Sequence, residues 1–279
     1  GASLSLGRIE NDHVQCPFHG IEFNSNGDCT LIPANGRQFK IPGNFKIRHY
    51  NAIEKHGFIW MFWGNIKEGL PEIPFFNNID RSLKYATLES HWNMHYTRCI
   101  ENQLDVLHLP FVHRTTIGKG NKTLVNGPRV DMSNNGFYVY LKNDTDTGQA
   151  PLKPAEMPLP LPGQQHLQFI FPNIWQNYLT EELRIFISFT PVDEENTILY
   201  LRMYQKIITI PVFKNLINFI MMKYNLVILN QDKNVVHTQI PKKSDLKMGE
   251  QLVTGDLPII RYRQTRQQML EKENQNQIN

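Results

Sequence analysis

A cysteine and a histidine stand three residues apart near the start of the chain, at Cys16 and His19. Pro17 and Gly20 favour a tight loop there, so that a thiolate and an imidazole can approach one small metal cluster. A mixed-ligand [2Fe–2S] cluster binds two cysteines on one iron and two histidines on the other. The pair could therefore supply half of such a ligand set. A free thiol beside a surface imidazole is the simpler interpretation of an isolated Cys-x-x-His. A zinc site is a third interpretation, although no second Cys/His pair has zinc-finger spacing.

A second group of candidate residues comprises Asn102, Asp105, His108 and His113. Asp105 and His108 are three residues apart, and we expect them to lie on one helical face. Pro110 should then bend the path, letting His113 converge on the same point. Two histidines and a distant carboxylate form the facial triad of non-haem Fe(II) oxygenases, which leaves positions open for O2. Taken singly, each histidine is more often structural.

Taken together, the two motifs resemble those of the Rieske non-haem iron oxygenases. Residues 16–20 match Cys-Pro-x-His-Gly, the second half of the Rieske cluster motif, and Phe23 follows as an aromatic strand position. Residues 102–113 match Asn-x-x-Asp-x-x-His-x4-His, the motif of the mononuclear iron. The chain is most similar to the group that contains dicamba and vanillate O-demethylases and toluenesulfonate methyl-monooxygenases.

The third iron ligand follows from this resemblance. Residues 230–236, NQDKNVV, are similar to the Glu-Asp-x-x-Val-Val stretch on the family's long C-terminal helix, with Gln231 in place of the usual Glu. The resemblance implies that Asp232 binds Fe(II) together with the two histidines. Asp232 is also the only carboxylate between Pro211 and Pro241, where we expect the long helix.

The resemblance also implies roles for two residues that are not ligands, and an assembly. Asp105 would join the ligand His108 to His19 of an adjacent subunit, and Asn102 would belong to the same catalytic site. Such a bridge requires a head-to-tail ring, most simply a homotrimer. The first half of the Rieske motif, Cys-x-His, is missing. We expect the full-length protein to carry it immediately before residue 1.

The pattern along the chain predicts an α+β protein. The family resemblance implies that these elements form a small all-β Rieske domain, residues 1–66, and a helix-grip catalytic domain, residues 67–279, with an antiparallel sheet and a long C-terminal helix. Helical spacing of apolar residues begins near Ser90, and a polar tail follows Gln267. Asn-Gly signals predict β-hairpins that turn at residues 25–28 and 34–36. We predict strands at residues 58–63, 137–141, 167–171, 183–189 and 197–203.

Composition narrows the class of protein. The formal charge is +3, with Lys and Arg scattered along the chain, which argues against a nucleic-acid binder. No apolar run approaches the ~20 residues that span a membrane. Three cysteines are too few for a disulfide framework and suit a reducing, cytoplasmic location. No dinucleotide-binding context surrounds residues 118–123, so electrons should come from a separate NAD(P)H-dependent reductase or a ferredoxin.

These inferences predict the oxygenase component of a Rieske monooxygenase, with a [2Fe–2S] cluster and a mononuclear Fe(II). It would use O2 to hydroxylate or oxidatively demethylate a small, aromatic substrate. An arene cis-dihydroxylating dioxygenase shares every iron ligand and stays an alternative. Two alternatives belong to other functional classes. A Rieske-type electron carrier would have no use for His108, His113 and Asp232. An iron-free binding protein would leave both metal motifs unused.

Overall fold

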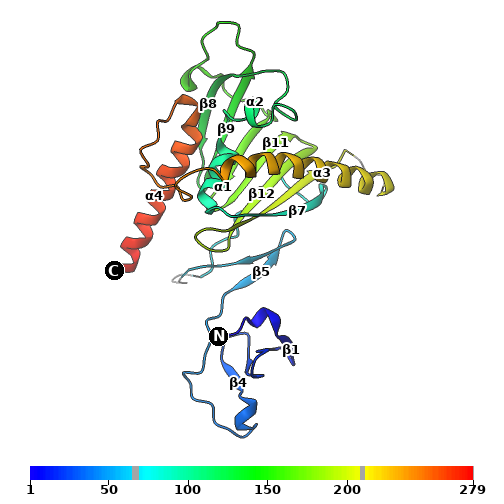
Figure 1. The fold of residues 1–279 in the computed structure, drawn as a ribbon, viewed down its shortest axis with the longest axis vertical. Helices are drawn as coiled ribbons and strands as arrows, with labels where there is room; N and C mark the ends of the chain where they lie inside the picture. Colours follow the sequence, from blue (N-terminus) through cyan, green and yellow to red (C-terminus); the bar gives the residue numbers. More distant parts are fainter. Residues whose placement is uncertain (65–68, 208–210, 279) are drawn as a thin grey trace. The chain divides into compact units, whose positions relative to one another are not determined.

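The structure is a computed structural model that describes residues 1–64, 69–207 and 211–278. The chain forms two compact units, Gly1–Ile73 and Pro74–Asn279, which Figure 1 colours from blue to cyan and from cyan to red. The predicted domain boundary between residues 66 and 67 lies outside the described residues.

The first unit is built of short strands. β1 (Arg8–Glu10), β2 (His13–Gln15), β3 (Glu22–Phe23) and β4 (Cys29–Leu31) form an antiparallel sheet in that order, and β5 (Ala52–Lys55) pairs with β6 (Phe58–Met61). The turn predicted at residues 25–28 is confirmed between β3 and β4, where Gly27 has a φ of 81°. The hairpin predicted at residues 34–36 is wrong, because no strand lies among the described residues between residue 36 and β5. A 3-10 helix, Pro33–Asn35, lies there because proline pre-sets the φ of a helix start.

The second unit contains a seven-stranded antiparallel sheet in the order β7-β13-β12-β11-β10-β9-β8. Four of its strands confirm sequence predictions and three were not predicted. The strands are β7 (Lys84–Trp92), β8 (Leu124–Met132), β9 (Gly136–Asp144), β10 (His166–Ile170), β11 (Ile174–Thr180), β12 (Leu183–Pro191) and β13 (Thr197–Gln205).

The helix predicted to begin near Ser90 begins later, at Tyr96. Ser90 and Trp92 belong to β7, whose inner residues alternate with exposed ones such as Glu89 and His91. This period of two is that of a strand with one buried face. The helix α1 (Tyr96–Leu104) begins only after His95, whose ring nitrogen accepts the backbone N–H of Thr97.

Three further helices follow: α2 (Leu109–Val112), α3 (Pro211–Val236) and α4 (Leu257–Ile278). The long helix predicted from Pro211 is confirmed. α3 lies across the sheet and contacts β7, and α4 contacts β8 (Figure 1). The polar tail predicted after Gln267 is helical, because the start of α4 is anchored by buried Ile259 and Tyr262.

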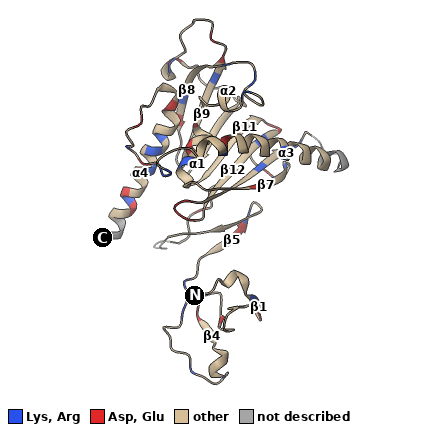
Figure 2. Cartoon of the chain, in the orientation of Figure 1, with Lys and Arg blue, Asp and Glu red and all other residues tan. Residues whose placement is uncertain are grey.

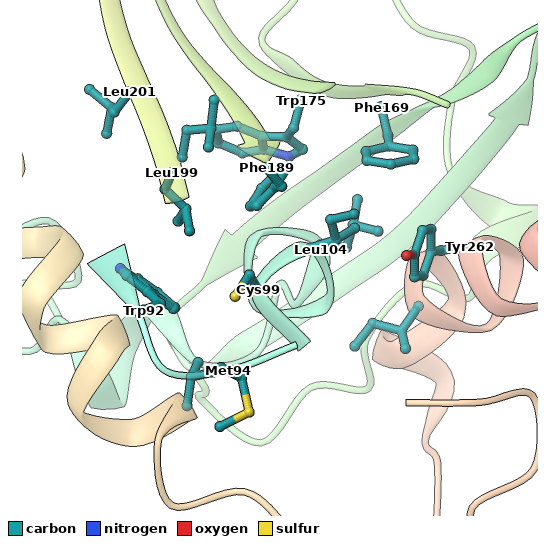
Figure 3. Close-up of a cluster of buried hydrophobic side chains, with 14 of the residues drawn as sticks. Trp92, Met94, Cys99, Leu104, Phe169, Trp175, Phe189, Leu199, Leu201 and Tyr262 are labelled. Carbon is teal, nitrogen blue, oxygen red and sulfur yellow. The ribbon is translucent and has the colours of Figure 1, made fainter. Parts of the chain in front are cut away.

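The hydrophobic core lies between the sheet and the helices (Figure 3). Leu104 of α1 and Tyr262 of α4 face Phe169 of β10 in that view, and the rings of Phe169 and Tyr262 meet edge to face at 5.4 Å. Alternation along the strands puts Phe186 on the opposite side, against Phe75. The inner face of the sheet, which carries Phe169, therefore packs against both α1 and α4.

Lys and Arg are interspersed with Asp and Glu along the described elements rather than gathered in a stripe (Figure 2). No helix among the described residues is both long and apolar enough to cross a membrane.

Candidate metal centre

The segment that holds Asp105 and His108 is a turn and not a helix, contrary to the sequence prediction. α1 ends at Leu104, and Asp105 has an extended backbone with ψ of 122°. The Asp105 carboxylate explains the break, because its Oδ1 accepts the backbone N–H of Leu107 at 2.6 Å and of His108 at 3.2 Å. Aspartate side chains compete with helical hydrogen bonds in this way. The turn still brings Asp105 Oδ1 within 3.7 Å of His108 Nδ1.

His113 is positioned by the short helix α2. Pro110 lies in the first turn of α2, so it begins a helix and does not bend an existing one as predicted. His113 follows as the C-terminal cap, and its carbonyl oxygen accepts the N–H of Gly118 at 2.9 Å. The residue is 1% exposed, and the ring is therefore held inside the unit.

Asp232 reaches the same place from α3. It follows the buried residues Asn225 and Leu229 at seven- and three-residue steps, and all three therefore lie on the face of α3 that meets the unit. α3 contacts both α1 and α2. Asp232 is 2% exposed, and a carboxylate so buried needs a cationic, metal or hydrogen-bonding partner.

The three side chains converge. His113 Nε2 lies 3.0 Å and His108 Nε2 3.4 Å from the same carboxylate oxygen, Asp232 Oδ1. One ligand atom from each residue lies within 4.8 Å of the others, and no second group of three such residues occurs in the part of the chain that the structure describes. Perpendicular ligands ~2.1 Å from one ion would stand roughly 3.0 Å apart. The donor set and its spacing therefore fit a divalent ion.

Amide side chains surround this cluster. Asn102 Nδ2 donates to Asp232 Oδ1 at 3.4 Å, and Gln103 Nε2 donates to Asp232 Oδ2 at 3.3 Å. On the other side, Gln231 Oε1 lies 2.8 Å from His113 Nδ1. Sequence analysis singled out Asn102 and missed the contact of Gln103. The only signal in the sequence was that Gln103 stands next to Asn102.

Electrostatics favours the charged forms of Asp105 and His113. Burial opposes an ionised Asp105, but the neighbouring His108 ring and the backbone N–H groups outweigh it and lower the pKa of Asp105. Burial likewise opposes a charged His113, yet the hydrogen bond to Asp232 raises the pKa of His113 above its ordinary value. The His108 Nδ1 atom is buried without a hydrogen-bond partner. A divalent cation among these groups would replace the proton that holds His113 to Asp232.

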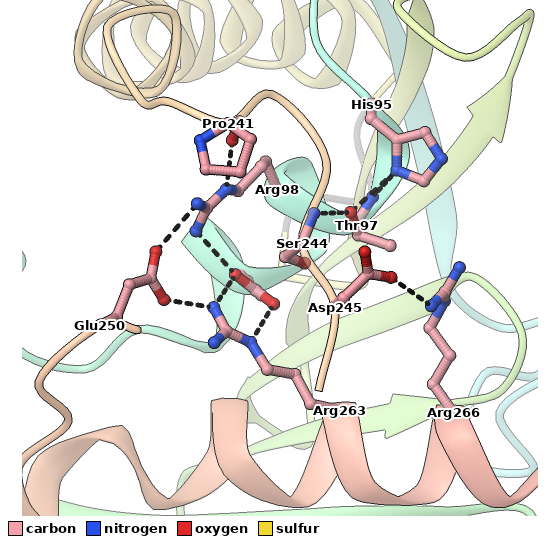
Figure 4. A network of polar contacts seen from close by, with 10 residues as sticks. His95, Thr97, Arg98, Pro241, Ser244, Asp245, Glu250, Arg263 and Arg266 are labelled. Carbon is pink, nitrogen blue, oxygen red and sulfur yellow. Dashed lines mark hydrogen bonds and ion pairs between the residues drawn. The ribbon is translucent and has the colours of Figure 1, made fainter. Parts of the chain in front are cut away.

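A buried ionic network fixes α1, the helix that leads into the cluster (Figure 4). Glu101 of α1 accepts two bonds from Arg263 of α4, at 2.7 and 2.8 Å, and one from Arg98 at 3.3 Å. Arg98 and Arg263 also each donate to Glu250 at 2.8 Å. Arg98 further donates to the carbonyl of Pro241, beyond the end of α3. The network thus ties α1 to α4 and to the segment that follows α3.

In the first unit, Cys16 and His19 lie in the loop between β2 and β3. The loop is closed by hydrogen bonds from Cys16 N–H to the carbonyl of Ile21 and from Gly20 N–H to the carbonyl of Cys16. Cys16 is half-buried, whereas His19 is exposed and its ring lies 3.8 Å from that of Phe18. The two residues could bind one iron each, and a [2Fe–2S] cluster needs one more ligand on each iron.

Comparison with known proteins places these sites in a family. Residues 92–272 match the vanillate O-demethylase oxygenase C-terminal domain, and residues 1–50 match the Rieske [2Fe-2S] domain. The chain belongs to the Rieske oxygenases of the vanillate O-demethylase type. The predicted family and the α+β fold class are therefore confirmed, and the chain contains both predicted domain types, the Rieske [2Fe-2S] domain and the oxygenase domain.

Relatives of this Rieske oxygenase share moderate identity. Methylxanthine N1-demethylase NdmA of Pseudomonas putida is 26% identical over 94% of this chain and 72% of its own length. A putative toluene-4-sulfonate monooxygenase iron-sulfur subunit of Comamonas testosteroni is 32% identical over 42% of this chain and 34% of its own length. The chain thus spans about a third of the sulfonate relative that it matches and nearly three quarters of the demethylase.

Solved structures share the fold. NdmA of Pseudomonas putida has a TM-score of 0.73 at 23% identity, covering 94% of this chain and 72% of that one. Dicamba monooxygenase bound to 3,6-dichlorosalicylic acid has a TM-score of 0.74 at 17% identity, covering 98% and 84%. The arrangement of a Rieske unit followed by a helix-covered antiparallel sheet is therefore common to all three.

Proposed function

We propose that His108, His113 and Asp232 hold one Fe(II) and that this chain is the oxygenase component of a Rieske monooxygenase system. The observation that carries the proposal is the approach of both imidazole Nε2 atoms, at 3.0 and 3.4 Å, to one oxygen of Asp232. A facial triad leaves coordination positions open for O2, which is the chemistry that the iron would supply.

The chain's own residues would hold the ion and set its charge. Asp232 contributes one negative charge, and Asn102 and Gln103 orient its two oxygens by hydrogen bonds. The two neutral imidazoles would leave the ion with a net positive charge. Burial of His113 and Asp232, at 1% and 2% exposure, excludes water from their side of the ion.

We further propose that Cys16 and His19 belong to a Rieske cluster and bind one iron each. Electrons would reach it from a separate NAD(P)H-dependent reductase or a ferredoxin. Asp105 would pass them on by joining His108 to His19 of an adjacent subunit in a head-to-tail trimer. In support, the Asp105 side chain is 31% exposed, and His19 is exposed, so both are accessible to another subunit. A cytoplasmic location belongs to the same proposal.

We propose a small aromatic substrate that carries a methyl group on oxygen, nitrogen or carbon. The relatives named for demethylation of methylxanthine and dicamba, and for monooxygenation of toluenesulfonate, support this class. Core aromatic residues between the sheet and the helices, such as Phe171 and Trp175, suit an aromatic ligand. No observation favours cis-dihydroxylation over this reaction.

The test is anaerobic loading with Fe(II), followed by measurement of bound iron. We expect the wild-type chain to hold about one ion at the triad, Asp232→Ala to lose it, and the control Asp245→Ala, which removes an exposed carboxylate, to keep it. Circular dichroism checks that the variants are folded. Iron retained by Asp232→Ala would refute the assignment. O2-dependent product formation would then be screened with full-length protein on methoxy-, methyl- and N-methyl-arenes.

A further inference from the structure

We propose that Gln231 is a positioning residue that fixes which nitrogen of His113 faces the metal, and that it does so without adding charge. The inference rests on the proposed iron site and concerns a residue that contacts a ligand rather than the ion. Gln231 Oε1 lies 2.8 Å from His113 Nδ1, while the other ring nitrogen, Nε2, faces Asp232. An amide oxygen can only accept a hydrogen bond, and Nδ1 must therefore carry the proton and leave the Nε2 lone pair free for the ion.

Two threonine hydroxyls of the loop after α2 accommodate this orientation of the amide. Thr116 Oγ1 donates to Gln231 Oε1 at 2.9 Å, and Gln231 Nε2 donates to Thr115 Oγ1 at 3.4 Å. Both lone pairs of the amide oxygen are thereby used, one by His113 and one by Thr116. The opposite orientation would point the Gln231 NH2 group at His113 Nδ1 and would put the ring proton on Nε2, against the ion.

The two histidines are supported differently. His108 has the carboxylate of Asp105 3.7 Å from its Nδ1, whereas His113 has a neutral amide. A carboxylate partner would make the imidazole a stronger electron donor and would add a negative charge beside the ion. With Gln231, the charge near the ion is limited to Asp232 and Asp105. We therefore expect weaker binding of a divalent ion than with glutamate at this position.

Substitutions at position 231 test the inference through metal affinity, with Co(II) as a visible-absorbing probe. Gln231→Met removes the acceptor at similar size, and we expect Co(II) affinity to fall on the order of 10- to 100-fold. Gln231→Glu keeps the acceptor and adds charge, and should bind Co(II) more tightly than wild type. Asn234→Asp is the matched control, because it adds the same charge at an exposed position of α3 and should leave the affinity unchanged.

The threonines give a second comparison. Thr116→Val removes the shorter bond to Gln231 and should weaken Co(II) binding more than Thr115→Val does. In the Zn(II)-loaded protein, nitrogen-15 spectra should show the His113 proton on Nδ1, with slow exchange that Gln231→Met abolishes.

The outcomes separate this inference from the iron site itself. Equal Co(II) binding by wild type and Asp232→Ala would mean that the triad holds no metal, and the proposed function would fail. Binding that needs Asp232 but stays within about twofold of wild type in Gln231→Met would overturn the role of Gln231 alone. A His113 proton found on Nε2 would do the same.

Discussion

Replacing Glu101 by glutamine should remove one of the largest electrostatic contributions to the stability of the second unit. The Glu101 side chain is 6% exposed and accepts three hydrogen bonds from two arginines that are themselves 4–5% exposed. Glutamine has nearly the same shape but only one acceptor atom, and its NH2 group would face a guanidinium. Both arginines would keep their charge and would share only the partly exposed carboxylate of Glu250.

Removing one partner of a buried ion pair costs roughly 3–5 kcal/mol, because the charge left behind is desolvated without compensation. The second unit contains 206 residues, from 74 to 279. A domain of that size loses ~2–4 °C in melting temperature for each kcal/mol. We therefore expect Glu101→Gln to lower Tm by roughly 6–20 °C.

The assay is urea denaturation followed by circular dichroism, with thermal melting as a second measurement. Glu195→Gln is the control, because Glu195 is 69% exposed and 3.5 Å from Lys242. Its substitution should change the free energy of unfolding by less than about 0.5 kcal/mol. A loss below about 1 kcal/mol for Glu101→Gln would refute the view that this network holds α1 against α4.

Three further predictions concern the two ends of α1 and the loop after α2. Burial lowers the pKa of His95 from 6.5 to about 4, so the unfolded chain takes up the proton first and stability should fall as pH drops from 6.5 towards 4. Urea titrations should show a flatter pH dependence for His95→Gln, and an unchanged slope would contradict this cause. Asp105→Asn should keep iron at the triad but slow electron delivery severely, measured by single-turnover kinetics of full-length protein; near-normal turnover would exclude the bridge. In Gly118→Ala, the new Cβ would overlap the carbonyl oxygen of Leu109, costing roughly 1–3 kcal/mol and displacing His113; wild-type Co(II) affinity would show that the loop adapts.

The sequence alone identified the side chains that could do chemistry. Cys16 and His19 share a tight loop, and His108 and His113 follow each other closely, because ligands within one short segment leave a pattern that spacing reveals. The apolar spacing of α3 and the alternation of the central strands likewise predicted these elements, since each pattern reflects one buried face. Asp232 was found by resemblance and by being the only carboxylate on that helix.

Tertiary structure decided what local patterns could not. Asp105 ends α1 through its own side chain, a competition between carboxylate and helix that spacing rules do not resolve. Trp92 fits a helical spacing with Tyr96 and a strand alternation with Ser90, and pairing with β13 selects the strand. The contact between Asn102 and Asp232 joins residues 130 positions apart, and it exists only because α3 lies across α1. The partners of His113 were beyond sequence analysis for the same reason: hydrogen bonds between distant segments leave no periodic trace.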